Sequence, residues 1–247
     1  MKILDSFSNM EFFGEVYHNQ TVWMPTSRKF DFVEWLKDKH DLEIKIGEKP
    51  FEDKDLVRFN HEHPEHFLNF LNSFSPKQYA GFKIFPEHLR WHKLKTNLLT
   101  NKKVIKIVMR RNLLDVYISD KILEMTKSSQ KQDTSDIKLN IDCLDFKTWY
   151  FDKMSFYSRV ESCLRNSGQQ YFELSYEDIH CHSSDDEKVR YIQSWLKQSG
   201  IEINDRPQIS DYVKKQDKRK NSLEKIQNDQ ELKSYLLNHN LQHLVHS

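Results

Sequence analysis

The segment that most constrains the fold is a short apolar run followed at once by two arginines and the start of a helix. Residues 103–109 read KVIKIVM, a β-branched and largely apolar run with the length of a buried strand. Arg110 and Arg111 follow it, and Asn112 is a favourable cap for a helix over residues 113–126. The sequence therefore predicts a buried strand that delivers two guanidinium groups to a helix N-terminus.

Strands and helices alternate along much of the chain. Further strands are predicted at residues 79–85 and 170–174, and helices at 2–8, from Ser27, from Pro64, from Pro86 to 99, at 145–166, at 186–197 before Gly200, and at 229–246. This alternation predicts an α/β fold, a central parallel sheet with helices on both faces, in which ligands bind at the carboxyl ends of the strands. We expect residues 1–247 to form a single domain.

Charge and composition exclude several classes of function. The chain has 38 basic and 37 acidic residues, and its net charge of +1 gives no broad field for nucleic acid or an anionic membrane, so an anion site must be local. Its three cysteines lack framework spacing and indicate reduced thiols. Because we find neither a long apolar run nor a signal peptide at the start, we predict no transmembrane segment and a cytoplasmic location.

The residues after the predicted strand are suited to binding a phosphate group. A helix N-terminus offers unpaired N–H groups and positive partial charge, and the fork of Arg111 matches phosphate oxygens. Ser119 lies one turn beyond Asp115 on the same helix face. The sequence therefore predicts that Arg111, Ser119 and backbone amides meet on one phosphate. The alternative is an arginine paired with a carboxylate and a serine facing solvent.

This segment resembles a motif of sulfotransferases that use 3′-phosphoadenosine 5′-phosphosulfate (PAPS). Those enzymes carry R-N-P-x-D-x-x-x-S after a strand, and here Arg111, Asn112, Asp115 and Ser119 stand at matching spacing. Leu113 replaces the proline, as in bacterial and carbohydrate-type members of the family. The resemblance implies the P-loop-containing sulfotransferase fold, with Arg111 and Ser119 holding the 3′-phosphate of PAPS.

Two weaker matches precede this motif. Residues 81–88, GFKIFPEH, resemble the G-x-K segment of the same enzymes, which implies that Lys83 meets sulfate or substrate. Residues 12–17, FFGEVY, resemble their G-E-x-[FY] segment, which implies that Glu15 is the base that deprotonates the acceptor. The alternatives are a solvated lysine and an ordinary glutamate. His88 is interpreted as a packing or capping residue, with catalysis as the alternative.

Two further matches follow the motif. Residues 172–179, FELSYEDI, resemble a strand and Y-E-D-L segment to which we assign no chemistry. Lys214 and Lys215 lie in a basic stretch that resembles the segment folding over the nucleotide, so the resemblance makes them cofactor-binding residues. The alternative is a solvated charged face.

The glycine-rich loop that such a nucleotide site needs is absent from the sequence. Its five glycines are scattered and form neither GxGxxG nor GxxxxGK[S/T]. In the family that the chain resembles, a first strand and a Gly/Ser/Thr-rich loop precede a helix like residues 1–8. We therefore expect an N-terminally truncated chain that lacks this strand and loop.

The activity implied by the resemblance is transfer of a sulfuryl group from PAPS to a hydroxyl or amine of an acceptor, which the R-R-N-x-L pattern suggests to be a glycan. No metal is required. The alternative is a non-catalytic pseudoenzyme or binding module that keeps the fold, which the missing loop favours. A P-loop kinase is disfavoured because no GK[S/T] sequence occurs.

Three histidine-containing segments could suggest a metal, but we predict none. Residues 61–66, HEHPEH, do not match HExxH, and Pro64 favours a polar loop before a helix. His239, His243 and His246 share one face of the last predicted helix without a complementary ligand motif. Residues 180–182, HCH, are interpreted as a loop.

Overall fold

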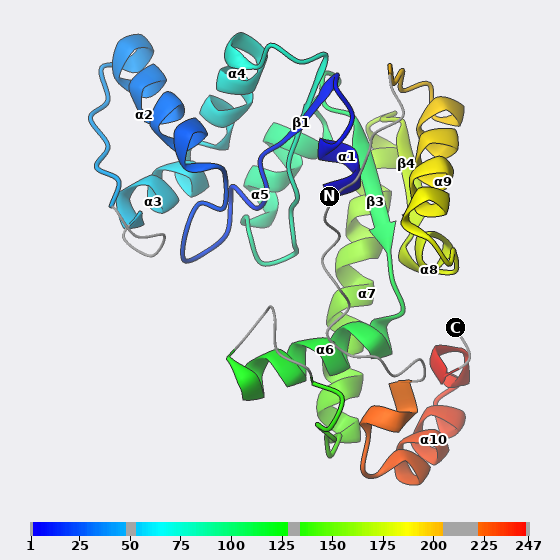
Figure 1. Ribbon diagram of the computed structural model, residues 1–247. Helices are drawn as coiled ribbons and strands as arrows, with labels where there is room; N and C mark the ends of the chain where they lie inside the picture. Colours follow the sequence, from blue (N-terminus) through cyan, green and yellow to red (C-terminus); the bar gives the residue numbers. More distant parts are fainter. Residues whose placement is uncertain (1, 48–52, 128–133, 205–221, 246–247) are drawn as a thin grey trace. The chain divides into compact units, whose positions relative to one another are not determined.

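The computed structural model describes residues 2–47, 53–127, 134–204 and 222–245 (Figure 1). It divides the chain into two compact units. Unit 1 consists of Met1–Lys106, Val160–Tyr171 and Asp185–Ser210, and unit 2 consists of Ile107–Arg159, Phe172–Ser184 and Asp211–Ser247. The interpretation of residues 1–247 as one domain stays a prediction.

Unit 1 combines a two-stranded sheet with a group of helices. Its elements are α1 (Lys2–Asp5), β1 (Met10–Phe12), α2 (Thr26–His40), α3 (Lys54–Glu62), α4 (Pro64–Phe74), β2 (Tyr79–Gly81), α5 (Trp91–Leu94), the π-helix Lys95–Leu99 and α9 (Asp185–Gln198). Strands β1 and β2 are parallel, with Met10 opposite Tyr79 and Phe12 opposite Gly81. Aromatic side chains form much of its core, including Phe13, Tyr17, Phe32, Phe67 and Phe70, all almost fully buried.

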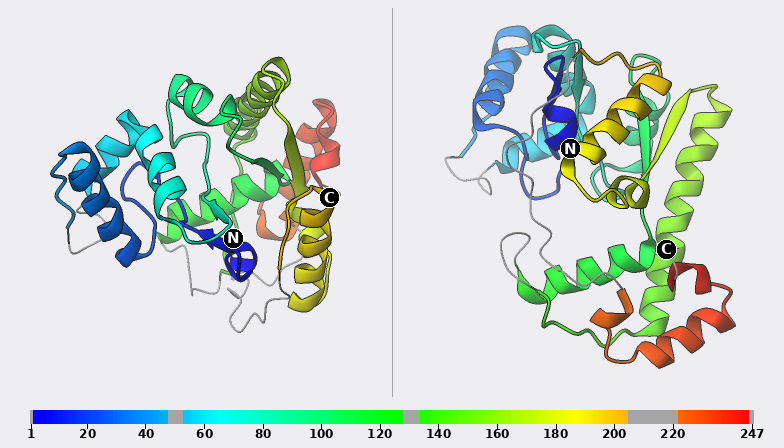
Figure 2. Two further views of the ribbon diagram at one scale, coloured as in Figure 1. Left: turned by 90° about the horizontal axis from the view of Figure 1, so that it is seen from above. Right: turned by 45° about the vertical axis from the view of Figure 1, so that its right-hand side comes forward.

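Unit 2 is built around a strand pair and a helical core. Its elements are β3 (Lys106–Arg110), α6 (Leu113–Thr126), α7 (Cys143–Asn166), β4 (Tyr171–Ser175), α8 (Tyr176–His180), α10 (Asp229–Asn238) and two 3₁₀ turns at Ser222–Lys225 and Gln242–Val245. The division assigns the last residues of α7, from Val160, and the first residue of β3 and of β4 to unit 1. Side chains from α6, the start of α7 and α10, among them Leu114, Phe146 and Leu232, share one buried cluster. Figure 2 (right) shows these three helices beside one another.

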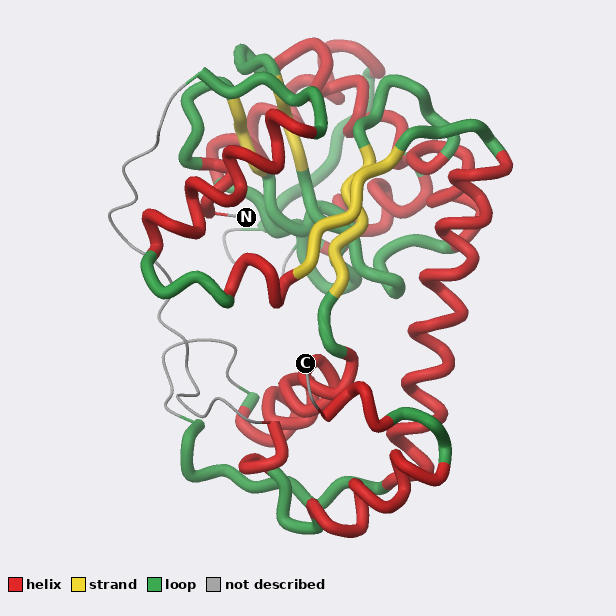
Figure 3. The backbone as a smooth tube through the Cα atoms, turned by 90° about the vertical axis from the view of Figure 1, so that its right-hand side faces the viewer, coloured by secondary structure: helices red, strands yellow, loops and turns green. Residues whose placement is uncertain are grey.

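Strands β3 and β4 lie side by side, as the yellow tubes in Figure 3 show. Beyond their carboxyl ends, the amide of Asn112 donates to the carboxylate of Glu177 at 2.8 Å. At their other ends, Lys106 donates to the side chain of Gln169 at 2.7 Å. Because like ends meet, the two strands run in the same direction. The end of β3 therefore presents Arg110 and Arg111 beside the start of α8.

The predicted helices are confirmed more closely than the predicted sheet. Helix α6 has the predicted bounds, Pro64 opens α4, and Gly200 follows α9 with a φ of 72°. The last predicted helix ends earlier, because α10 stops at Asn238. These helices have clear apolar spacing or start signals, which local sequence is sufficient to specify.

The prediction of one central sheet with helices on both faces is only partly confirmed. The α/β class holds, but the described residues form two short two-stranded sheets. The strand predicted over residues 79–85 stops at Gly81, and the helix predicted from Pro86 is a turn, with α5 starting at Trp91. The strand predicted over residues 103–109 begins only at Lys106, and it is not fully buried, since Met109 is 45% exposed. A strand with one hydrogen-bonded neighbour leaves much of its surface uncovered.

Candidate functional site

The junction between β3 and α6 in unit 2 is shaped by Asn112. Its side-chain oxygen accepts hydrogen bonds from the amides of Leu114 at 2.8 Å and Asp115 at 3.3 Å, which is an N-cap. Its side-chain nitrogen donates to the carbonyl oxygen of Leu244 at 2.8 Å. Asn112 therefore fixes the direction of the chain as it leaves the strand.

Arg111 lies beside this cap with its donors only partly used. Its Nη2 donates to the hydroxyl oxygen of Ser119 at 3.4 Å, and its guanidinium stacks on the ring of Tyr176 at 4.4 Å from the centroid. Its Nε is buried and has no hydrogen-bond partner in the described part of the chain. A buried donor without an acceptor is costly, and a guanidinium fork is satisfied best by two oxygens of one anion.

We call Arg111, Ser119 and Tyr176 the Arg111 site. The structure brings Arg111 and Ser119 together, as their spacing predicts. The Ser119 hydroxyl is exposed and currently donates to the carbonyl oxygen of Asp115 at 2.8 Å, so it must rotate to donate to an anion. No described carboxylate pairs with Arg111, which disfavours the alternative of a purely structural ion pair.

The backbone amides contribute less than the sequence predicts. The amides of Leu114 and Asp115 are occupied by the Asn112 side chain, and the amide of Asn112 is occupied by Glu177. An anion here would therefore depend on the Arg111 fork, the Ser119 hydroxyl and the positive end of the α6 dipole. Sequence reasoning missed Tyr176, although an aromatic residue just after the neighbouring strand was the available signal.

Unit 1 holds a second group of polar side chains, which we call the Glu15 cluster: Glu15, Lys83 and His88. One oxygen of Glu15 lies 2.6 Å from Lys83 Nζ, and the other lies 3.7 Å from His88 Nε2. The structure thus brings together the two predicted catalytic residues, and adds His88, which the sequence interpretation left as a packing or capping residue.

Gly14 is the residue that makes this cluster possible. Its φ is 83°, and a Cβ atom there would lie 2.4 Å from the backbone oxygen of Trp23. Its carbonyl oxygen accepts from the amide of Lys83 at 2.8 Å, while Glu15 pairs with Trp23 in an antiparallel bridge. Only glycine combines this conformation with such a close approach, so it sets Glu15 beside Lys83.

His88 is held as a neutral imidazole in one tautomer. Its Nδ1 accepts from the amide of Phe85 at 3.3 Å, which leaves the proton on Nε2, facing Glu15. Burial, opposed by the charge of Glu15, lowers the pKa of His88 to about 4, and the side chain is 2% exposed. Lys83 is partly exposed and lies over the ring of Phe85. A carboxylate, an ammonium and an imidazole in contact can accept, hold and return a proton.

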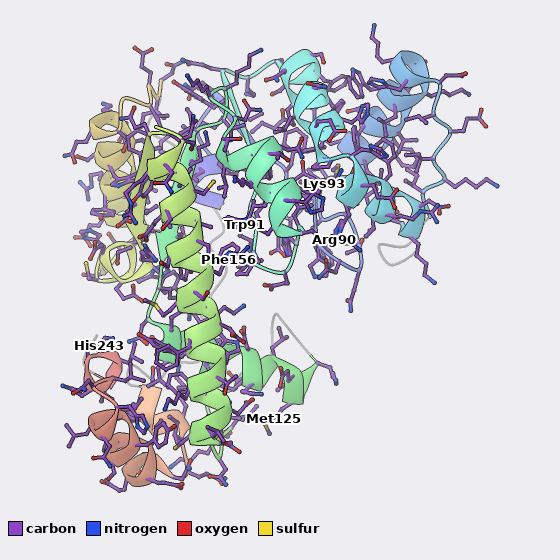
Figure 4. All side chains as sticks on the ribbon, turned by 180° about the vertical axis from the view of Figure 1, so that it is seen from behind. Arg90, Trp91, Lys93, Met125, Phe156 and His243 are labelled. Carbon is purple, nitrogen blue, oxygen red and sulfur yellow. The ribbon has the colours of Figure 1, made fainter. Side chains whose placement is uncertain are left out.

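A cavity of about 270 Å³ lies in unit 2. Its walls include Tyr117, Lys121, Met125 and Asp145, of which Met125 is 63% exposed (labelled in Figure 4). The Tyr117 hydroxyl donates to Asp145 at 2.6 Å, and Lys121 lies 3.1 Å from the same carboxylate oxygen. These contacts satisfy one another, so the cavity presents no unpaired group of the kind that Arg111 offers.

Other predicted residues lie outside the described residues or apart from these sites. Lys214 and Lys215 fall outside the described ranges, as does His246. His239 Nδ1 donates to the Tyr235 carbonyl oxygen at 2.9 Å, at the end of α10. His180 stacks on Tyr176, on which Arg111 also stacks. The helices of the described ranges include none with the length and apolar character needed to cross a membrane.

Comparison with known proteins finds similarity to a protein that is named for a flavin cofactor. The chain is 29% identical over 156 residues to a protein of Trichlorobacter lovleyi named FMN-dependent NADH:quinone oxidoreductase, covering 60% of this chain and 71% of that protein. No family model matches the chain. No solved structure matches it either.

This comparison corrects the predicted activity and cofactor. The prediction of sulfuryl transfer from PAPS is wrong, because the similar protein is named for FMN and for oxidation–reduction. The physical reason is that the pattern of Arg111 and Ser119 predicts at most a phosphate group and not the molecule that carries it. The phosphate of FMN and the 3′-phosphate of PAPS present the same tetrahedral oxygens to a guanidinium fork, so the motif does not distinguish the two. The hydroxyl-bearing acceptor stays a prediction that these findings do not test.

Proposed function

We propose that the chain binds FMN through its phosphate at Arg111 and Ser119, and that it takes part in flavin-dependent oxidation–reduction. The observation that carries this proposal is the buried Nε of Arg111, which has no acceptor among the described residues although its Nη2 reaches Ser119. A phosphate dianion would supply the missing acceptor and accept from both side chains. The similar protein from Trichlorobacter lovleyi supports FMN as the source of that phosphate.

The surroundings of Arg111 suit this group. The ring of Tyr176 lies against the guanidinium and keeps its plane in one orientation. The N-terminus of α6, fourteen residues long, adds positive partial charge. Glu177 is already engaged by the Asn112 amide and the Ser175 hydroxyl, so its charge is partly compensated. The role of Arg111 and Ser119 is to bind and orient the phosphate end of the cofactor.

Bound FMN would supply the transfer of electrons and hydride, which no side chain of the protein provides. In this proposal the Glu15 cluster handles protons. Glu15 accepts a proton at Oε2, Lys83 lowers the cost of its negative charge, and neutral His88 orients toward it through Nε2–H. We propose these three residues as a proton-handling group of unit 1, with binding of the phosphate assigned to unit 2.

The proposal is tested by titrating the protein with FMN and following flavin fluorescence. We expect saturable binding of FMN and much weaker binding of riboflavin, which lacks the phosphate. Arg111→Ala should weaken FMN binding roughly 10- to 150-fold, because a hydrogen bond to a charged group contributes about 1.5–3 kcal/mol. Arg110→Ala is the matched control, since Arg110 is engaged by Glu173 and the ring of Tyr157.

Two results would overturn the proposal. Equal affinity for FMN and riboflavin, or an unchanged affinity in Arg111→Ala, would remove Arg111 from the binding of the phosphate. Binding of adenosine 3′,5′-bisphosphate without binding of FMN would keep a phosphate site but exclude the flavin. A circular dichroism spectrum of each variant verifies that the loss is not one of folding.

We propose the finer architecture separately from the activity. The β3–α6 junction, with an arginine at the strand end and a capped helix, supports assignment to the P-loop-containing fold that sulfotransferases have. This proposal concerns the fold and implies no sulfuryl transfer. An experimental structure in which β3 and β4 belong to a larger parallel sheet would support it, and an isolated strand pair would contradict it.

A further inference from the structure

A group of histidines and one glutamate in unit 1 is not used by the proposed function. His63, Glu65 and His66 each offer a ligand atom, and these atoms all lie within 4.8 Å of one another. We call these three residues the histidine cluster. We propose that the histidine cluster binds a zinc-type divalent ion, with His40 as the residue that orients His66.

The ligand types and distances suit such an ion. Zinc binds imidazole nitrogen and carboxylate oxygen at about 2.0–2.2 Å, so two tetrahedral ligand atoms lie roughly 3.3–3.5 Å apart. His63 Nδ1 and Glu65 Oε1 are 3.5 Å apart. His66 completes three protein ligands, which leaves a fourth position for water, as in open zinc sites. His63 is exposed, while Glu65 and His66 are half-buried, so the ion can enter from solvent.

The fold holds these residues at a sharp junction between two helices. Helix α3 ends at Glu62 and α4 begins at Pro64, so His63 alone separates them. The loop predicted over residues 61–66 is thus a tight corner, and Pro64 creates the corner that brings His63 back to the first turn of α4. The spacing His63, Glu65, His66 therefore works through this turn and not through the helical HExxH geometry.

Three hydrogen bonds, two of them buried, anchor this corner to the rest of unit 1. The hydroxyl of the fully buried Tyr17 donates to the carbonyl oxygen of Pro64 at 2.9 Å. Asn60 donates to the carbonyl oxygen of Val16 at 3.1 Å. Lys93, labelled in Figure 4, donates from α5 to the carbonyl oxygen of Glu62 at 2.5 Å. The backbone around the histidine cluster is fixed on three sides before any ion binds.

His40 and two aromatic rings orient the imidazoles. His40, the last residue of α2, has its Nε2 3.2 Å from Nδ1 of His66. A ligating histidine whose other nitrogen is held by a neighbour is fixed in tautomer and ring orientation. Trp35 packs on His40, and Phe59 packs on both His63 and His66.

The test is a titration of untagged, chelator-treated protein with Co²⁺, followed by visible absorption, and with Zn²⁺ in competition. We expect one equivalent of Co²⁺ to give the intense bands of a low-coordinate ion and Zn²⁺ to remove them. His40→Ala should weaken binding about 10–100-fold, because it removes a residue that supports a ligand, and His63→Ala and His66→Ala should each weaken binding more than His40→Ala does. His92→Ala, an exposed histidine on α5, is the control and should bind as the wild type does.

Several results would overturn the inference. A spectrum that stays that of aqueous Co²⁺ would exclude the site, and equal binding by His63→Ala and the wild type would place the ion elsewhere. Competition by Mg²⁺ or Ca²⁺ would indicate an unspecific carboxylate site, because these ions prefer oxygen ligands. If His66→Ala loses its helical spectrum, His63→Ala decides the question, since the exposed His63 side chain contributes little to the core. None of these outcomes depends on whether FMN binds at Arg111.

Discussion

The Arg111 site of unit 2 and the Glu15 cluster of unit 1 differ in how far apart their residues lie in the sequence. Arg111 and Ser119 belong to one strand–helix junction and meet through local geometry. Glu15 meets Lys83 and His88 only because β1 and β2 pair and Gly14 approaches Trp23. The first site is therefore encoded in a short segment, whereas the second depends on the tertiary packing of unit 1. Substitutions that disturb that packing should separate the two.

The largest effect is expected from Asp53→Ala, which tests whether the two sites depend on one another. Asp53 is fully buried and forms an ion pair with the buried Lys29. Removing the carboxylate leaves an ammonium buried without a partner, which costs about 3–5 kcal/mol. We expect urea denaturation to show this loss in unit 1, with FMN affinity retained at urea concentrations where unit 2 is still folded. Asp38→Asn, exposed on α2, is the matched control and should be neutral.

A second prediction uses the pH dependence of unit 1. The pKa of His88 is about 4 in the folded protein and 6.5 in the unfolded chain, so between these values the unfolded state binds more protons. Stability should therefore fall as the pH drops from about 6.5 to 4, by roughly 2–3 kcal/mol, and be constant above that window with respect to His88. Urea denaturation at several pH values measures this slope.

His88→Gln should remove most of that slope, whereas His92→Gln should leave it. The charged and titratable groups that face His88 are Glu15, Glu87, His18 and Lys83, so each must be intact in the variants that are compared. A wild-type protein with no loss of stability between pH 6.5 and 4.5 would contradict the assignment of His88 as a buried neutral imidazole.

Gly14→Ala sharpens the comparison with a smaller change. The positive φ and the contact with the Trp23 oxygen should cost about 1–3 kcal/mol, and the strain should move Glu15 away from Lys83. We expect the stability of unit 1 to fall in urea denaturation while FMN affinity is unchanged. Gly168→Ala is a control, because its φ is also positive but no atom lies within 4 Å of the added Cβ. Equal effects of both substitutions would indicate backbone strain alone.

The smallest effect is expected from Asn112→Ala in unit 2. It removes the N-cap of α6 and the bond to the Leu244 oxygen, which should cost about 0.5–2 kcal/mol. It also frees the amides of Leu114 and Asp115 to donate to the phosphate, which offsets the weaker helix start. The affinity for FMN should therefore change little. Asn112→Asp keeps the cap but adds a negative charge next to the phosphate, and should weaken FMN binding more than Asn112→Ala does. The opposite order would contradict a phosphate at this position.

The sequence was sufficient for features with a local signal and insufficient for features that depend on pairing. Asn112 and the apolar residues after it predict α6 with its observed bounds, and Pro64 predicts the start of α4. The apolar segment before Arg110 predicts a strand, but its residues do not indicate how many neighbouring strands pair with it. Met109 is accordingly exposed, and the central sheet is replaced by two strand pairs among the described residues.

The same distinction applies to the sites. Glu15 and Lys83 were selected by resemblance, whereas Tyr176 and His88 became part of a site only through the fold. His63, Glu65 and His66 did not suggest a metal in sequence, because their spacing fits no helical motif, and only the corner at Pro64 brings their ligand atoms together. The identity of the cofactor was mispredicted because a phosphate-binding pair does not reveal what carries the phosphate.

By itself, the sequence determined α6, the start of α4, a strand that leads into Arg111, and the pairing of Arg111 with Ser119, because hydrogen bonds and side-chain spacing within one turn or one junction decide these features. Tertiary structure alone decided the partners of β3, the contact of His88 with Glu15, and the grouping of the histidine cluster. Those features bring together segments that are distant in the chain, and their formation depends on packing and burial that no local pattern records.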